Sequence, residues 1–167
     1  MRRQRGFTLM ELLIVLAIIL IIAGITIPSL VHVKINANET SAVASIKAIL
    51  TAQMSYQTTY QAQGYASSLA ALGGSESCTP SPANACLLDE VLTSGTKAGY
   101  NFAVAGGNPA NGANTTYVVG AAPEAYNRTG VRRFCATEKG VIRRDANTEG
   151  STTPPTADEC ARFQAMR

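Results

Sequence analysis

The four cysteines, Cys78, Cys86, Cys135 and Cys160, are the side chains in this sequence best suited to covalent chemistry. None belongs to a C-x-x-C pair and the sequence has a single histidine, so a zinc site would lack ligands at the usual spacings. An even number of cysteines behind an apolar N-terminal signal favours two disulfides in an oxidising compartment. Of the three possible pairings we predict the sequence-local set, Cys78–Cys86 and Cys135–Cys160; four free thiols are the alternative.

Motifs for catalysis are missing from the sequence. A Ser–His–Asp site would depend on the single histidine, and there is no G-x-S-x-G, no H-E-x-x-H and no phosphate-binding loop with a lysine. We therefore expect no enzymatic activity and no cofactor, with one exception to weigh. "DANTEG" (145–150) matches the start of a calcium loop through Asp145, Asn147 and Glu149, but Thr156 replaces its closing Glu. Calcium at these three residues is one hypothesis, and a solvated turn is the other.

An unusual carboxylate, Glu11, lies near the start of a long apolar run. No charged residue occurs from Leu12 to Val33, and a helix of that length would span about 33 Å, close to the hydrocarbon thickness of a bilayer. A secretory signal peptide, the first alternative, has an apolar region of only ~7–15 residues. Three arginines before the run and one lysine soon after it favour a cytoplasmic N-terminus.

An ionised carboxylate in hydrocarbon costs several kcal/mol, so Glu11 needs a partner. A cut between Gly6 and Phe7 would create an ammonium group four residues from Glu11, on the same chain or on an adjacent identical chain. A pair between chains would turn an unfavourable group into an assembly signal.

"RGFTLMELLIV" (5–15) resembles the class III leader of type IV pilins and of the related type II secretion pseudopilins. The matching residues are Gly6, Phe7, Thr8, Leu9 and Glu11, the apolar stretch 12–22, and Pro28 at the family's usual proline position. The resemblance implies cleavage after Gly6 by a prepilin peptidase, N-methylation of Phe7, and neutralisation of a neighbouring subunit's Phe7 amine by Glu11. It also implies a helix break near Gly24 and Pro28, and calcium in a C-terminal loop of some pseudopilins. A plain signal anchor is the alternative.

The long helix is expected to run from residue 7 to residue 60. Beyond Asn38 its apolar positions follow helical spacing, whereas Gly24 and Pro28 weaken it. These apolar positions form a stripe along one face of the helix: Val43, Ile46, Ile49, Leu50, Met54 and Tyr60. The polar residues Glu39, Ser45, Lys47, Gln53 and Gln57 are expected mostly on other faces. We divide the chain into a leader (1–6), a transmembrane and assembly half (7–33), an amphipathic half (34–60) and a globular head (61–167).

The head is expected to be a loop region (61–99), an antiparallel sheet (100–144) and a C-terminal loop (145–167). Short helical turns are predicted in 65–74 and 87–95. Strands are predicted at 100–105 and 115–121, with two more in 130–144 around the turn "TEKG". Between the first two strands, the nine turn-forming residues "GGNPANGAN" (106–114) are predicted to be a loop. The fold class is therefore α+β, a pilin fold whose long N-terminal helix packs on three or four antiparallel strands.

These observations favour a structural subunit of a type IV pilus-like filament over a major pseudopilin of a type II secretion system or a monomeric anchored module. The expected partners are identical subunits, a prepilin peptidase, the inner-membrane assembly machinery and membrane lipid before assembly. The precursor is expected in the bacterial inner membrane and the product at the cell surface, or in the periplasm for a pseudopilus. Nucleic acid is not an expected partner, because the chain beyond Gly6 has 11 basic and 11 acidic residues. The basic cluster in 128–144 is read as a solvated face or a contact with a neighbouring subunit.

Overall fold

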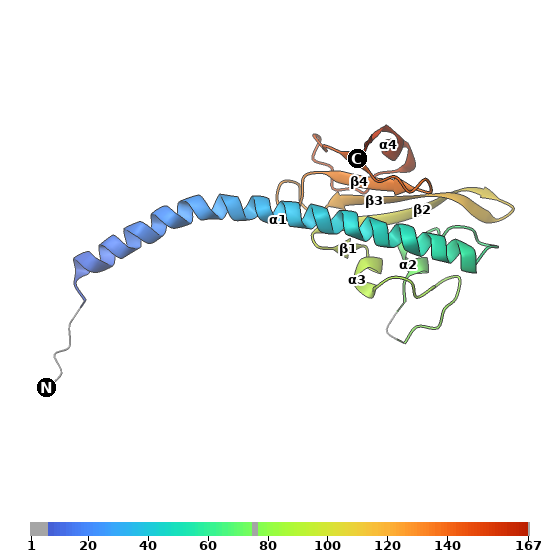
Figure 1. The fold of residues 1–167 in the computed structure, drawn as a ribbon, viewed down its shortest axis with the longest axis horizontal. Coiled ribbons are helices and arrows are strands. Elements are labelled where there is room, and N and C mark those ends of the chain that lie inside the picture. The colour runs from blue at the N-terminus through green and yellow to red at the C-terminus, as the bar shows by residue number, and fades with distance from the viewer. Residues whose placement is uncertain (1–6, 75–76, 167) are drawn as a thin grey trace. The chain divides into compact units, whose positions relative to one another are not determined.

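The computed structural model describes residues 7–74 and 77–166, and their helices and strands form an α+β fold (Figure 1). The chain divides into two compact units, one up to Lys34 and one from Ile35 onwards. Of the two residues at the predicted cleavage site, Gly6 lies outside the described residues and Phe7 lies within them. The second unit contains part of the long helix and the whole sheet.

Helix α1 (Leu9–Thr59) contributes to both units. Its backbone remains helical across Gly24 and Pro28, so the expected break is not present in this single copy. Local melting within a filament stays a prediction. Residues 7–33 were expected to contain a transmembrane half, but no helix among the described residues is both long and apolar enough to cross a membrane.

Within the second unit, α1 buries a stripe whose positions alternate by three and four residues, the spacing of one helix face. The apolar members are Ile35, Ala42, Ile46, Ile49 and Tyr56, with Ala52 beside them. The predicted stripe was partly wrong in its phase. Met54, expected in the core, is 65% exposed, and Glu39, Ser45 and Gln53, expected on other faces, are buried.

Within the described residues, six strands form one antiparallel sheet in sequential order, whereas the sequence pattern predicted three or four. The additional strands are β1 and β6, each two residues long. The strands are β1 (Thr96–Lys97), β2 (Tyr100–Ala110), β3 (Ala113–Pro123), β4 (Arg133–Thr137), β5 (Arg143–Asp145) and β6 (Gln164–Ala165).

Strands β2 and β3 are much longer than predicted because the stretch 106–114 is not a loop. It continues both strands up to a two-residue turn at Asn111 and Gly112. Both turn residues have positive φ, 52° and 85°, which is the conformation that matches the twist of a hairpin and favours Asn-Gly. The composition rich in turn-forming residues therefore reflects one tight turn rather than nine loop residues.

The sheet is covered on both faces. Core residues of α1 pack with Tyr100, Val119 and Phe134 on one face. On the other face Val118 and Cys135 pack with Cys160, which lies in α4 (Ala157–Arg162). The two short predicted helical turns are confirmed as α2 (Leu69–Leu72) and α3 (Glu90–Thr93). The C-terminal segment is thus a covering layer of the sheet and not a free loop.

Candidate functional site

The candidate assembly site lies at the start of α1, where Thr8 precedes the first helical residue. The Thr8 hydroxyl accepts a hydrogen bond from the Glu11 backbone N–H at 3.2 Å and donates to Glu11 Oε2 at 3.4 Å. This arrangement resembles a capping box, in which a Thr and a Glu three residues later satisfy groups at a helix N-terminus. In the single chain, Glu11 therefore has a local partner at the place where a carboxylate also favours the helix dipole.

The helix surface around this site is apolar and uncovered in the single copy. Phe7 is 77% exposed, and the large apolar side chains that follow are all roughly half exposed or more. These are Leu9, Met10, Leu12, Leu13, Ile14, Val15, Leu16, Ile18, Ile19, Leu20, Ile21 and Ile22. An exposed apolar surface of this extent marks a binding surface for lipid or protein. A side chain at Gly24 would also meet no atom within 4 Å, so packing within the copy does not require glycine there.

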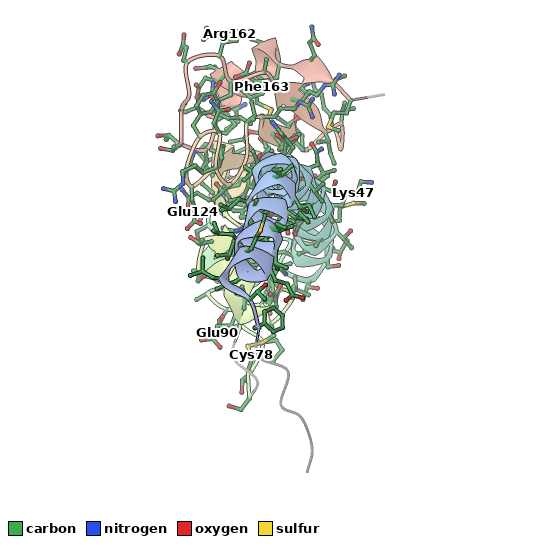
Figure 2. The ribbon with its side chains drawn as sticks, turned by 90° about the vertical axis from the view of Figure 1, so that its left-hand side faces the viewer. Lys47, Cys78, Glu90, Glu124, Arg162 and Phe163 are labelled. Atoms are coloured by element: carbon green, nitrogen blue, oxygen red, sulfur yellow. A yellow bond between two sulfur atoms is a disulfide. The ribbon has the colours of Figure 1, made fainter. Side chains whose placement is uncertain are left out.

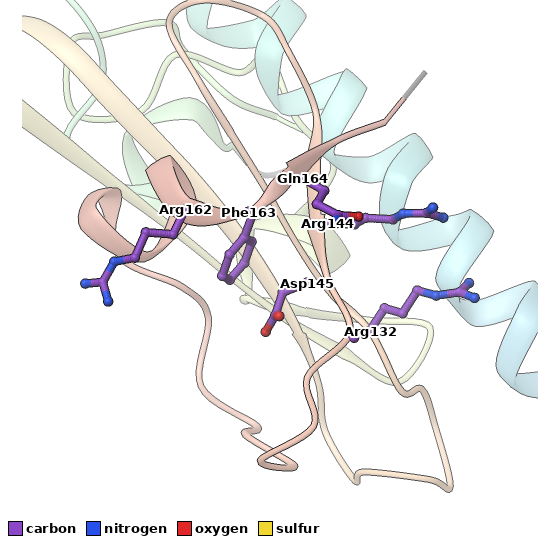
Figure 3. A pocket seen from close by; sticks show the side chains of 7 residues that line it. Arg132, Arg144, Asp145, Arg162, Phe163 and Gln164 are labelled. Atoms are coloured by element: carbon purple, nitrogen blue, oxygen red, sulfur yellow. The ribbon is translucent and has the colours of Figure 1, made fainter.

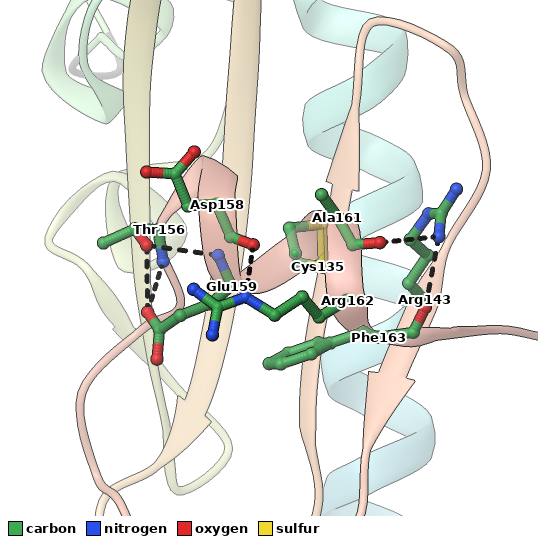
Figure 4. The surroundings of a disulfide bond; sticks show 9 residues. Cys135, Arg143, Thr156, Asp158, Glu159, Ala161, Arg162 and Phe163 are labelled. Atoms are coloured by element: carbon green, nitrogen blue, oxygen red, sulfur yellow. Dashed lines mark hydrogen bonds between the residues drawn. A yellow bond between two sulfur atoms is a disulfide. The ribbon is translucent and has the colours of Figure 1, made fainter.

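The predicted disulfide pairing is confirmed. Cys78 pairs with Cys86 and Cys135 pairs with Cys160, and no described cysteine is free. The first closes the surface loop before α3, whereas the second joins β4 to α4 with both residues fully buried (Figure 4). Cys78 and Phe163, the latter just beyond α4, lie on opposite sides of the head (Figure 2). The two bonds therefore fasten different parts of the head.

Arg133 binds two carboxylates beneath the C-terminal segment. Its Nη2 lies 3.0 Å from Asp145 Oδ2 and its Nη1 lies 3.0 Å from Glu159 Oε1, while its guanidinium carbon lies 5.3 Å from the centre of the Phe163 ring. The side chain of Arg133 is 90% covered, and the carboxylates balance its charge. This ion-pair network and the Cys135–Cys160 disulfide both hold α4 on the sheet.

Stability should fall in acid because of Glu159. Its carboxylate accepts a hydrogen bond from the Thr156 backbone N–H at 2.8 Å and also binds Arg133, and these contacts lower its pKa below the ordinary value of 4.5. A lowered folded-state pKa stabilises the fold above the unfolded-state pKa, and this contribution is lost as the pH falls through the folded-state value. We expect Glu159→Gln to lower the melting temperature at pH 7 slightly, and the difference from wild type to vanish in acid. Thermal melts monitored by circular dichroism between pH 7 and pH 2.5 would measure it; a difference independent of pH would contradict the assignment.

Glu39 joins α1 to the segment before β4. Its Oε1 accepts hydrogen bonds from the backbone N–H groups of Val131 and Arg132 at 3.1 Å, and its Oε2 binds Arg132 Nη1 at 2.9 Å. One residue earlier, the Asn38 amide donates to the Thr129 carbonyl at 2.8 Å. These contacts fix the helix against residues 129–132, more than ninety positions later in the chain.

Removing the Glu39 carboxylate should destabilise the head more than removing its arginine partner. We expect Glu39→Ala to lower the free energy of unfolding by about 2–3 kcal/mol, because two backbone donors lose a charged acceptor. Arg132→Gln should cost less than about 1 kcal/mol, since that side chain is half exposed and the backbone bonds remain. Urea unfolding of the full chain in detergent, followed by circular dichroism, gives both values. Equal losses in the two variants would contradict this division.

Two of the three calcium candidates, Asp145 and Asn147, are bound to other groups of the head. Asp145 binds Arg133, and the Asn147 Oδ1 accepts a hydrogen bond from the Ser151 N–H at 2.8 Å. The Asn147 amide also donates to the Val131 and Ser151 carbonyls, so a buried amide closes this loop, while Glu149 is exposed. Within the described ranges, no group of three His, Cys, Asp or Glu side chains is placed to hold a metal ion.

The hydrogen bonds of three residues, Thr8, Glu39 and Gln53, were not predicted from the sequence. Gln53 is fully buried and exchanges two hydrogen bonds with the backbone of Ala66, at 2.8 and 3.0 Å. Gln53 and Glu39 lie on the same stripe as Ile46, and that spacing was the signal that could have revealed them. For Thr8, the signal was the T-x-x-E pattern at a helix start.

The N-terminus matches a known family model, the prokaryotic N-terminal methylation motif, over residues 1–27. Two relatives are similar to part of the chain. The type IV major pilin protein PilA of Myxococcus xanthus is 46% identical over 54 residues, covering 32% of this chain and 24% of that protein. The type IV wide pilus major component PilA4 of Thermus thermophilus is 46% identical over 57 residues, covering 34% and 44%.

The chain thus spans less than half of the length of either relative. No solved structure gives a significant match to the chain. The methylation motif and both pilins nevertheless agree with the resemblance that Gly6, Phe7 and Glu11 carry. The chain is therefore similar to two type IV pilins over about a third of its length, and residues 1–27 match the prokaryotic N-terminal methylation motif.

Proposed function

We propose that this protein is a structural subunit of a type IV pilus-like filament. The observation that carries the proposal is the methylation motif over residues 1–27, which combines Phe7 and Glu11 with an exposed apolar helix surface. The two relatives support a filament, since one is named a major pilin and the other the major component of a wide pilus.

In this proposal the precursor is made at the inner membrane and cut between Gly6 and Phe7 by a prepilin peptidase, which also methylates the new amine. The assembly machinery then adds the subunit to the filament. Copies cover one another's apolar side chains between residues 9 and 22, and this burial supplies the main driving force, about 25 cal/mol per Å² of apolar surface.

Glu11 gives this packing its register. Once neighbouring copies exclude water, an unpaired carboxylate would cost several kcal/mol, and an ammonium group on a neighbour's Phe7 offsets that cost. The hydrogen bond with Thr8 holds Glu11 at the helix start in the free chain. The pair therefore favours one stagger of neighbouring helices over others.

A major pseudopilin of a type II secretion system would use the same cleavage and the same packing in a short periplasmic filament. The names of the two relatives favour a pilus over this alternative.

Intact-mass analysis of the mature protein tests the processing steps. We expect a chain that begins at Phe7 and carries one additional methyl group. A variant with a bulky residue at the cut, Gly6→Val, should keep the leader and serves as the unprocessed standard. A mature wild-type chain that retains residues 1–6 would contradict the proposal.

A further inference from the structure

A pocket of about 410 Å³ lies in the head between β5 and the segment after α4 (Figure 3). Its wall consists of Arg132, Arg144, Asp145, Ala146, Arg162, Phe163 and Gln164. We propose that this pocket binds an acidic oligosaccharide, through the carboxylates and hydroxyl groups of one or two sugar units. The inference does not rest on filament assembly.

Two arginines of the wall are available to an anion. Among the described residues, neither Arg144 nor Arg162 forms an ion pair, and both are exposed. The Arg162 Nε donates to the Asp158 carbonyl at 3.3 Å, and the two terminal nitrogens of its guanidinium remain for a ligand. They lie on either side of Phe163 (Figure 3). Arginine presents a planar fork of donors that matches a carboxylate, so each can bind one acidic group. An oligomer with an acid on successive sugar units could therefore meet one cation at each side of the ring.

The single acid in the wall does not cancel these charges. Asp145 and Glu159 share the single charge of Arg133, so these three residues leave one negative charge against the two positive charges of Arg144 and Arg162. The third arginine, Arg132, is paired with Glu39 and acts as a neutral part of the wall. Arg144 and Arg162, which form no ion pair among the described residues, thus set the sign of the pocket.

The remaining groups suit the rest of a sugar. Phe163 supplies an apolar ring surface, with Arg133 near its ring. No described donor binds the Asp145 Oδ1, and no described group binds the Gln164 side-chain amide, so both can exchange hydrogen bonds with hydroxyl groups. The pocket volume falls within the range of small-molecule sites, where an apolar wall and a few polar groups set orientation.

A nucleic acid fits these observations less well. Binding to a duplex depends on many phosphate contacts along a basic surface. Residues 35–167 contain 10 basic and 10 acidic residues, from 14 minus Arg2, Arg3, Arg5 and Lys34, and from 11 minus Glu11. The Arg143 guanidinium does not extend the basic surface freely, because it donates to the Ala161 and Phe163 carbonyls (Figure 4).

Calorimetric titration of the full chain in detergent micelles tests the proposal. The probe is hexagalacturonate, with maltohexaose as a neutral hexamer and a single-stranded hexanucleotide as a second polyanion. We expect heat only with hexagalacturonate, and an affinity at least tenfold lower in Arg144→Gln/Arg162→Gln, because this variant removes both charged donors that the wall offers to an acidic sugar. Arg128→Gln, an exposed arginine outside the pocket, is the matched control and should bind as wild type does.

Three results would overturn the inference: no heat with hexagalacturonate, equal binding of maltohexaose or the hexanucleotide, or an affinity unchanged in the double variant. Equal loss in Arg128→Gln would also overturn it, since the effect would then follow net charge and not the pocket. Micelle-bound chains need not polymerise, so a failure here and a failure of filament assembly are separate results.

Discussion

Glu11→Gln is expected to reduce recoverable filaments at least tenfold while leaving the amount of processed protein unchanged. Glutamine keeps the shape of the side chain and can still serve in a capping arrangement with Thr8, so the helix start should persist. Only the negative charge is lost, and with it the partner that we propose for a neighbouring subunit's Phe7 ammonium. A pair worth about 1.4 kcal/mol at each subunit contact would already change the assembly constant tenfold. Shearing cells and measuring the protein in the fibre fraction gives the result.

Met10→Leu is the matched control for that variant. Met10 neighbours Glu11, is 72% exposed in the single copy, and would change in shape without a change in charge. Its filaments should match wild type. Normal fibre yield from Glu11→Gln, or an equal loss from Met10→Leu, would show that the charge of Glu11 does not contribute to assembly and that apolar packing alone drives it.

The second large effect concerns the disulfide between β4 and α4. We expect Cys135→Ala/Cys160→Ala to lower the free energy of unfolding by about 3.5 kcal/mol, because a cross-link over 25 residues restricts the unfolded chain by about that much. Both residues are fully buried, so the lost packing adds to the effect. The corresponding fall in melting temperature is about 10 °C for a chain of this size.

The other disulfide provides a direct comparison. Cys78→Ala/Cys86→Ala opens a link over only 8 residues in a surface loop, and the same argument gives about 2.5 kcal/mol. Thermal melts of both double variants, followed by circular dichroism, measure the difference. A smaller loss from the buried pair than from the surface pair would show that the C-terminal segment contributes little to the fold.

The disulfides were predictable because pairing each cysteine with its neighbour in the sequence lets each bond close one local segment. A Pro-containing loop lies between Cys78 and Cys86, and the segment that ends at Cys160 has few other features. The sequence did not decide between calcium binding and a solvated turn at Asp145. A partial ligand pattern does not reveal that Arg133 binds the carboxylate, since that contact depends on the pairing of β4 with β5.

The phase of the long helix was harder to predict from composition. Met54 is apolar and stands at helical spacing, yet it is exposed, whereas Glu39 and Gln53 are buried. Their burial depends on groups distant in sequence, the N–H groups of residues 131 and 132 and the backbone of Ala66. Burial of a polar residue is favourable only where it finds such hydrogen-bond partners. The pattern of apolar residues along the sequence does not show where those partners lie.

The extent of the sheet was underestimated for a different reason. Gly106, Gly107, Asn108 and Pro109 are poor strand formers, so the sequence favoured a loop there. In the structure this stretch pairs with 113–117, and the turn residues Asn111 and Gly112 hold the hairpin in register. The geometry of that turn outweighs the intrinsic preferences of the residues before it.

Electron microscopy of the sheared fibre fraction, with mass-spectrometric identification of the fibre protein, tests the central claim most directly. We expect long surface fibres whose main component is this chain, beginning at a methylated Phe7. A chain found only as single copies in the membrane fraction, with no fibres containing it, would contradict the claim that it is a filament subunit.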